Sequence, residues 1–306
     1  MIYTVTLNPA LDYFMTYDEI ELGSVNRSGT TRMSPGGKGI MESQMLNIMG
    51  TENTALGFIG GFSGKFIRDD LQRKGIKTAF TVTLAESRIN VKVKTTTAET
   101  SLDAVGPELT EDDIENFLTS FEQLTTNDIV VFAGTAPISL GDDFYIHLIH
   151  IVKRRQANFA IDIDGQKLLE TLCQTPIVIK PNKEELEGIF SVKFAKKEDI
   201  FPYGKKMLDM GAQNVIVSMA GEGALLFTGK KCYFAPPVKG IIKNSVGAGD
   251  ATVAGFLAEW SKTRDPVKSF KQGIACGSAK VFSEDMPSIN FVKRCYQQIN
   301  IEELLI

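Results

Sequence analysis

Short apolar runs rich in β-branched residues recur along the chain, and between them apolar residues return every three or four positions. The short runs are typical of buried strands, and the longer stretches are typical of amphipathic helices. The pattern predicts strands at residues 2–7, 55–59, 129–133, 159–163, 177–179 and 215–218, and helices at 111–124, 142–155, 166–173 and 202–210. Alternating strands and helices predict an α/β fold with a doubly wound, mostly parallel sheet flanked by helices.

Two segments depart from this pattern because their polar and apolar residues alternate. One follows the first strand up to residue 35, and the other contains the run Ile89–Lys94. Strict alternation is typical of a strand with one face in water. We therefore expect a single domain over residues 1–306, in which segments of about 11–35 and 86–107 form a small β-sheet lid. Its apolar face needs a cover, so a homodimer joined through the lids is expected.

Composition and charge narrow the possible partners. Of the 306 residues, 33 are Lys or Arg and 37 are Asp or Glu, and no basic block occurs, so we expect no nucleic-acid partner. No apolar run is long enough to cross a bilayer, so no membrane partner is expected either. The 4 cysteines lie far apart without a C-x-x-C pair, which is typical of reduced thiols. These features predict a cytoplasmic protein that binds a small molecule.

The strongest local motif is N-S-V-G-A-G-D at Asn244–Asp250, just before the apolar run Val253–Trp260. Small residues at the start of a helix let a ligand approach the N–H groups at the positive end of the macrodipole. Such a helix start binds anions and suits a transferring phosphoryl group, with Asp250 placed to deprotonate an attacking hydroxyl. The same residues also fit a tight turn in which Asp250 is simply a favourable helix-start charge, and the motif alone leaves both open.

A second glycine cluster, Pro35–Gly39, contains Lys38 and also opens a helix-like run. It does not fit the P-loop pattern, and no G-x-G-x-x-G stretch follows a strand, so a dinucleotide site is not supported. Lys38 could hold a phosphate as a point charge. On this fragment alone, a solvated lysine in a flexible loop is the better interpretation.

Two polar clusters lie near the ends of later strands. The first, Lys180–Glu185, follows the strand at 177–179, where ligands of α/β sheets bind. Its Asn182 and Glu185 suit the hydrated Mg²⁺ of a nucleotide and equally suit a helix N-cap with its capping box. The second, Ser218–Ala224, suits either a turn against a nucleotide or a plain hairpin.

In their order along the chain, these motifs resemble the ribokinase-like (PfkB) sugar kinases, and within them the bacterial 1-phosphofructokinase and tagatose-6-phosphate kinase branch. The matching stretches cover nearly the whole chain: T-L-N-P-A-L-D at 6–12, V-N-R at 25–27, G-G-K-G-I at 36–40, G-F-I-G-G-F at 57–62, R-I-N-V-K at 88–92, F-A-G-T-A-P at 132–137, I-K-P-N-K-E-E-L at 179–186, V-S-M-A-G-E-G-A at 217–224 and K-N-S-V-G-A-G-D at 243–250. The resemblance implies a doubly wound core with a β-sheet lid, and transfer of a phosphoryl group from ATP, with Mg²⁺, to a ketohexose phosphate.

The resemblance also implies roles for individual residues. Asp250 is expected to be the catalytic base, with the anion hole at Gly247, Ala248 and Gly249. Substrate binding is expected from Asp12, Gly37, Lys38, Gly39, Arg88 and, from the lid, Arg27. Nucleotide binding is expected from Lys180, Asn182, Ser218, Gly221, Glu222 and Gly223, and Mg²⁺ binding from Glu185.

The sugar side of the motif pattern is altered at Met41, where family members have asparagine. A thioether is a poor hydrogen-bond partner, whereas an amide both donates and accepts. Within the family, V-S-M-A-G-E-G-A and K-N-S-V-G-A-G-D resemble 1-phosphofructokinase more than tagatose-6-phosphate kinase. The resemblance therefore implies fructose 1-phosphate as substrate, converted to fructose 1,6-bisphosphate. Tagatose-6-phosphate kinase and a catalytically weak sugar-phosphate sensor remain alternatives. A kinase of unphosphorylated sugars or nucleosides is disfavoured, because Lys38 and Arg88 suit an anionic substrate.

Overall fold

The computed structural model describes residues 1–163 and 165–305. Its strands are β1 Ile2–Thr6, β2 Ala10–Thr16, β3 Thr30–Gly36, β4 Asn53–Gly60, β5 Lys77–Thr78, β6 Thr81–Thr83, β7 Arg88–Lys94, β8 Glu99–Leu102, β9 Ile129–Ala133, β10 Asn158–Asp162, β11 Asn214–Ser218, β12 Ala224–Thr228, β13 Lys231–Ala235 and β14 Glu302–Leu304. Its α-helices are α1 Lys38–Ile48, α2 Gly61–Arg73, α3 Glu111–Thr119, α4 Phe144–Arg154, α5 Lys167–Leu172, α6 Lys183–Phe190, α7 Phe201–Asp209, α8 Ala248–Thr263, α9 Pro266–Val281 and α10 Ile289–Gln298, and 3₁₀ turns lie at Ile138–Leu140, Lys197–Ile200 and Ala220–Glu222. None of the helices described is long and apolar enough to cross a membrane.

The main sheet is parallel from its β5 edge to β11 and antiparallel from β11 to its β14 edge. Its parallel part has the order β10-β9-β1-β4-β5, with β6 also paired to β4. The antiparallel part has the order β11-β12-β13-β14. Ile179 joins the two parts, because it forms parallel bridges with Ile161 on one side and with Val215 on the other. The predicted mostly parallel, doubly wound α/β fold is therefore confirmed.

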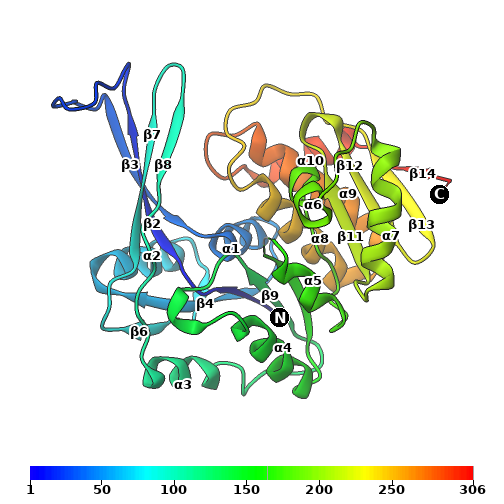
Figure 1. Ribbon diagram of the computed structural model, residues 1–306, viewed down its shortest axis with the longest axis horizontal. Coiled ribbons are helices and arrows are strands. Elements are labelled where there is room, and N and C mark those ends of the chain that lie inside the picture. Colours follow the sequence, from blue (N-terminus) through cyan, green and yellow to red (C-terminus); the bar gives the residue numbers. More distant parts are fainter. Residues whose placement is uncertain (164, 306) are drawn as a thin grey trace.

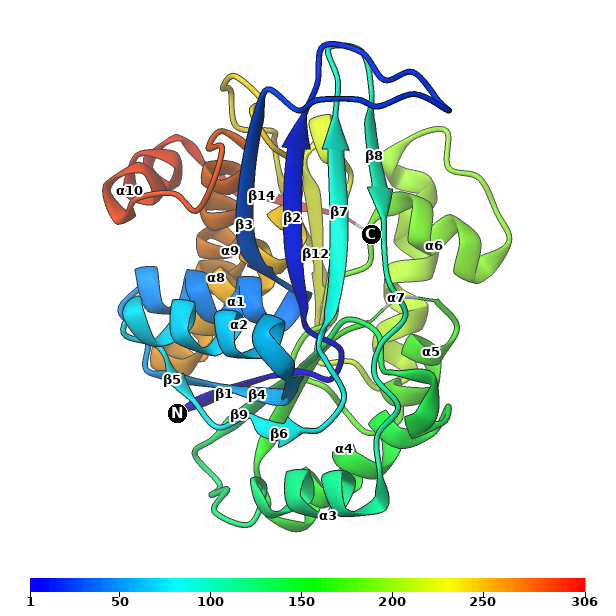
Figure 2. The same ribbon diagram turned by 90° about the vertical axis from the view of Figure 1, so that its left-hand side faces the viewer.

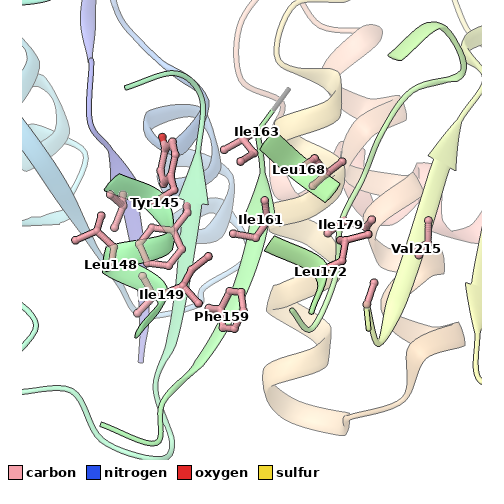
Figure 3. Close-up of a cluster of buried hydrophobic side chains, with 14 of the residues drawn as sticks. Tyr145, Leu148, Ile149, Phe159, Ile161, Ile163, Leu168, Leu172, Ile179 and Val215 are labelled. Carbon is pink, nitrogen blue, oxygen red and sulfur yellow. The ribbon is translucent and has the colours of Figure 1, made fainter. Parts of the chain in front are cut away.

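Helices bury both faces of this sheet. Tyr3 and Val5 of β1 belong to a cluster that includes side chains of α3 to α7, whereas Ile2 belongs to a second cluster with α1, α8, α9 and α10. Figure 3 shows part of the first cluster, in which residues of α4, β10 and α5 interdigitate. Close packing of apolar side chains on both faces fixes the carboxyl ends of the strands, and with them the loops that carry polar groups.

Four strands leave the main sheet and form a separate sheet, which we call the lid. Its order is β3-β2-β7-β8; β2 is antiparallel to β3 and parallel to β7, and β7 is antiparallel to β8. Strands β2 and β3 lie within residues 10–36, and β7 and β8 lie within residues 88–102. Figure 1 shows the lid standing away from the α/β core at one end of the molecule.

The two faces of the lid differ in polarity. Asp12 and Phe14 of β2 line a cleft between the lid and the core. Tyr13 lies on the opposite face, where its register partners are Met33 and Val91. By strand alternation this outer face carries Leu11, Tyr13, Met15, Met33, Ile89, Val91, Val93 and Leu102. Met33 is 49% exposed and Leu102 is 59% exposed, and in Figure 2 no other element covers the upper part of this face.

Candidate active site

A cleft of about 460 Å³ lies between the lid and the carboxyl ends of the parallel strands. Lid strands β2, β3 and β7 form one wall, and the starts of α1 and α8 belong to the other. This is where ligands of an open α/β sheet are expected. The residues that line the cleft include five of the predicted site residues, namely Asp12, Gly37, Lys38, Arg88 and Asp250.

The glycine turn before α1 is shaped by its contact with Asp12. A Cβ atom at Gly36 would collide with the Asp12 carboxylate, so this carboxylate crosses directly over the turn. The Nδ2 of Asn90 donates a hydrogen bond to Asp12 Oδ1 at 2.9 Å. Burial raises the pKa of Asp12, and the hydrogen bond from Asn90 opposes that rise. The Asp12 carboxylate is thus fixed on the cleft side of β2 as a hydrogen-bond acceptor, which suits binding of sugar hydroxyls.

Two predicted substrate residues lie outside the cleft lining. Gly39 packs on the first strand, where a Cβ atom would lie 2.5 Å from Thr6 Oγ1. Arg27 lies in the exposed loop between β2 and β3. Direct contact of either residue with substrate stays a prediction.

Arg88 opens β7 with its guanidinium group already oriented. Its Nε donates to the carbonyl of Asn8 at 3.1 Å, and its Nη1 donates to the carbonyl of Ala104 at 3.4 Å. Burial lowers the pKa of Arg88, while the carboxylates of Asp103 and Asp12 oppose this, and the group stays a cation at neutral pH. The remaining N–H groups of a guanidinium fixed at two points suit a bidentate contact with a phosphate.

Asp162, at the end of β10, draws two lysines together. Lys38 Nζ lies 3.5 Å from Asp162 Oδ1, and Lys180 Nζ lies 4.0 Å from the same oxygen. Lys180 also contacts the start of α8, because a Cβ atom at Gly249 would lie 2.8 Å from its Nζ. Asp162 and Lys180 are 4% and 7% exposed, so these charges interact in a poorly solvated place. Asp162 stands within the strand predicted at 159–163, but it was not among the residues predicted for the site.

The start of α8 has the geometry of an anion site. Gly247 is its N-cap and has a φ of 78°, a conformation that favours glycine. The Ala248 N–H donates to the Ser245 carbonyl at 3.2 Å. In the described part of the chain, the N–H groups of Gly247 and Gly249 make no hydrogen bond. With Asp250 in the first turn, the helix brings N–H dipoles and a carboxylate to one point of the cleft.

Met41 lies against this helix start. A Cβ atom added at Gly247 would lie 2.6 Å from Met41 Cε. The Nε2 of Gln44 lies 3.9 Å from the Met41 sulfur. Met41 lines the cleft, so a thioether faces the place where ligand would bind. The substitution noted in the sequence therefore concerns a group that touches the anion site itself.

The other residues predicted to bind nucleotide come from the start of α6 and the turn after β11. Asn182 forms a parallel bridge with Ser218, which precedes the 3₁₀ turn that contains Gly221 and Glu222. Lys183 Nζ lies 3.4 Å from a carboxylate oxygen of Glu222 and ties the turn to α6. At Gly223, in the same motif, a Cβ atom would collide with the backbone carbonyl of Ala235.

Asn182 and Glu185 form the capping box that the sequence allowed. Asn182 Oδ1 accepts from the Glu185 N–H at 2.7 Å, and Glu185 Oε2 accepts from the Asn182 N–H at 2.8 Å. The other carboxylate oxygen of Glu185, Oε1, takes no part in this capping box. Mg²⁺ binds through few protein oxygens together with water and phosphate, so the residues present fit a hydrated ion. The described residues contain no cluster of three His, Cys, Asp or Glu side chains suited to a metal.

Glu42, in the second turn of α1, is a charged residue that sequence reasoning missed. It is 0% exposed, and neither carboxylate oxygen has a hydrogen-bond partner among the residues that the structure describes. Burial raises its pKa well above the ordinary value, and the charges of Asp162 and Asp250 raise it further, against Lys38 and Lys180. A carboxyl group in this setting holds its proton at pH values where exposed glutamates are ionised.

We expect Glu42→Gln to stabilise the protein more at pH 8 than at pH 4. At low pH both folded and unfolded Glu42 are protonated. As the pH rises past the unfolded pKa, only the unfolded state ionises, so the wild type loses free energy of unfolding and the variant does not. Urea unfolding should give a gain of about 1–3 kcal/mol at pH 8. The exposed Glu115→Gln serves as control, and a gain at pH 8 no larger than that at pH 4 would contradict the prediction.

The chain belongs to the pfkB family of carbohydrate kinases, whose family model matches residues 5–287. It is therefore a phosphotransferase that moves a phosphoryl group from ATP to a sugar hydroxyl, as the resemblance in the sequence implied. It is 42% identical over 304 residues to 1-phosphofructokinase of Bacillus subtilis, covering 99% of this chain and 100% of that protein. It is also 34% identical over 305 residues to D-tagatose-1-phosphate kinase of Bacillus licheniformis, covering 99% and 100%.

The fold matches that of phosphofructokinase-2 from Escherichia coli in complex with substrates and products. The TM-score is 0.91, with 97% of this chain and 98% of that chain covered. Because the two chains are 23% identical, this likeness concerns the fold alone.

Proposed function

We propose that the protein is a 1-phosphofructokinase, which transfers the γ-phosphoryl group of Mg-ATP to fructose 1-phosphate and yields fructose 1,6-bisphosphate. The observation that carries this proposal is that one cleft holds the Asp250 carboxylate at a helix start together with two cations, Lys38 and Arg88. The carboxylate suits deprotonation of a hydroxyl, and the cations suit a substrate that already bears a phosphate. The 42% identity to a 1-phosphofructokinase over the full chain supports this choice of sugar phosphate.

The residues divide the reaction between them. Asp250 accepts the proton of the attacking hydroxyl, while the N–H groups of Gly247 and Gly249 stabilise charge on the moving phosphoryl group. Arg88 holds the phosphate of the substrate, and Asp12 accepts hydrogen bonds from sugar hydroxyls. Mg²⁺, when bound, supplies further charge neutralisation at the phosphates. Because the transition state of phosphoryl transfer is loose, positioning and charge neutralisation contribute most of the rate enhancement.

The experiment that tests the proposal is ADP release from Mg-ATP with a panel of acceptors. The panel contains fructose 1-phosphate, fructose 6-phosphate, tagatose 1-phosphate, tagatose 6-phosphate and the unphosphorylated sugars. We expect the highest kcat/KM with fructose 1-phosphate and little turnover of free sugars. A higher kcat/KM with a tagatose phosphate would mean that this sugar phosphate, and not fructose 1-phosphate, is the substrate. No turnover of any acceptor despite ATP binding would favour a sugar-phosphate sensor.

Met41 favours the sensor as a second candidate, because the thioether leaves sugar hydroxyls without the family's amide partner. If the protein is an enzyme with a weakened sugar site, Met41→Asn should raise kcat/KM for fructose 1-phosphate by roughly tenfold, since a recovered buried hydrogen bond contributes about 1–3 kcal/mol. Met41→Leu has no amide and should bring no gain. A loss of activity in Met41→Asn would mean that the pocket is built around methionine.

We also propose a homodimer joined through the outer faces of the lids. Eight apolar or aromatic side chains share this face, and its upper part, with Met33 49% and Leu102 59% exposed, is an apolar sheet surface of the kind that favours association with a partner. Size-exclusion chromatography with light scattering should give twice the chain mass for the wild type. The double variant Met33→Asp/Leu102→Asp should shift it to a monomer, whereas the exposed Leu84→Asp, outside the lid strands, should leave it dimeric. A monomeric wild type would contradict the proposal.

A further inference from the structure

Lys280, near the end of α9, is a lysine that neither the sequence motifs nor the proposed mechanism uses. It lines the active-site cleft and is 1% exposed. Its Cε would lie 3.7 Å from a Cβ atom at Gly247, the N-cap of α8. Lys280 and Met41 therefore flank the same glycine of the anion site from different helices.

The loop before α8 is attached to the end of α9, which fixes Lys280 beside it. The N–H groups of Lys243 and Asn244 both donate to the Val281 carbonyl, at 2.9 and 3.1 Å. Asn244 Nδ2 also donates to the Glu284 carbonyl at 3.0 Å. These bonds join the anion-site loop to the residues that follow Lys280 and so hold the end of α9 beside the start of α8.

Unlike the other lysines of the cleft, Lys280 forms no ion pair with any residue that the structure describes. Lys38 pairs with Asp162 at 3.5 Å, and Lys92 pairs with Asp103 at 2.7 Å. Within residues 1–163 and 165–305, the side chain of Lys280 makes neither an ion pair nor a hydrogen bond. Burying an ammonium group without a direct partner is costly. An anionic ligand bound in the cleft would provide that partner.

The charges around Lys280 point to the reacting end of the cleft. Burial lowers the pKa of Lys280, and the cation of Arg32 lowers it too, whereas the carboxylates of Asp285 and Asp250 raise it. Asp250 is the proposed base, so Lys280 lies within electrostatic range of the hydroxyl that Asp250 would deprotonate. Arg88, which we assign to the phosphate already on the sugar, lies in the lid on the opposite wall.

We infer that Lys280 is a further catalytic residue, which binds the terminal phosphate of Mg-ATP during transfer together with the N–H groups of Gly247 and Gly249. This inference rests on the proposed kinase function and deepens it. An ammonium group placed beside the helix start neutralises charge on the transferred group in a water-poor site, where such contacts are strongest. A contact restricted to the terminal phosphate distinguishes ATP from ADP.

The test compares binding of Mg-ATP and Mg-ADP to the wild type and to Lys280→Met by calorimetry. We expect the Kd of Mg-ATP to rise tenfold or more in the variant, the Kd of Mg-ADP to change less than threefold, and kcat to fall by about 10²-fold. Lys271→Met, on the same helix beside Tyr296, should change none of these values. Equal effects on ATP and ADP, or a change confined to the KM of the sugar phosphate, would overturn the inference.

A thermal melt separates this role from a structural one. Replacing a buried ammonium group that forms no ion pair in the described structure by methionine should leave the melting temperature unchanged or raise it. A marked fall in the melting temperature would mean that Lys280 serves stability instead. Lys280→Gln provides a second variant with the same expected loss of discrimination between ATP and ADP. Because nucleotide binding needs no sugar, these results hold even if fructose 1-phosphate fails as a substrate.

Discussion

Replacing Asp250 by asparagine is expected to lower kcat by about 10²–10⁴-fold, the usual contribution of a positioned general base. Asparagine has nearly the same shape but cannot accept the proton of the attacking hydroxyl. Mg-ATP and sugar phosphate should still bind, because the helix start and the lid cations are unchanged. Steady-state kinetics and a binding titration on the same variant measure both quantities.

Asp285→Asn is the matched control, since Asp285 also lines the cleft and carries a carboxylate. Its partner Arg32 lies 3.4 Å away in an exposed ion pair, which contributes little. The control should retain kcat within about threefold. A near-normal rate for Asp250→Asn would mean that Asp250 only provides a favourable charge at the start of the helix. Another group would then have to be the catalytic base.

Arg88→Met is expected to raise the KM for fructose 1-phosphate by about 10–100-fold with a much smaller change in kcat. A hydrogen bond to a charged group contributes about 1.5–3 kcal/mol, and the substrate phosphate keeps this contact in both ground and transition states. Arg88→Lys should recover only part of the affinity, because an ammonium group lacks the guanidinium's paired donors.

Arg73→Met tests whether loss of any arginine has the same effect. Arg73 lies on α2, pairs with Asp70 and is 69% exposed outside the cleft, so its replacement should leave KM unchanged. An unchanged KM for Arg88→Met would mean that another cation binds the phosphate. A fall in kcat without a change in KM would assign Arg88 to the transition state instead.

Elements of the fold could be predicted where the sequence has a continuous run of apolar residues. The strand predicted at 129–133 is β9, Ile129–Ala133, because five consecutive apolar residues admit no surface position. Helix α9 was not predicted from periodicity. Its contacts with α8 involve small residues, with Gly273 and Gly277 lying against Thr252, so much of the buried face lacks the large apolar side chains that mark a helix. The run at 177–179 forms bridges through Ile179 but no regular strand.

Site residues could be predicted from the sequence where they lie in a recognisable local motif. Lys38 and Asp250 each stand in a glycine-containing stretch at the start of a helix, whereas Asp12 lies within β2 and was predicted only through the family resemblance. The structure brings all three into one cleft. Glu42 and Lys280 carry no such signal, because each is a single charged residue inside a helix. Their burial beside Asp250 becomes visible only when α1, α8 and α9 pack together.

The most direct test of the proposed reaction is the identity of its product. Incubation of the protein with Mg-ATP and fructose 1-phosphate, followed by ³¹P NMR, should show ADP together with one sugar that bears two phosphomonoesters, fructose 1,6-bisphosphate. The Asp250→Asn variant should leave the spectrum of the starting mixture almost unchanged over the same time. ATP consumed without a second sugar phosphomonoester, or no reaction by the wild type, would contradict a 1-phosphofructokinase built around Asp250.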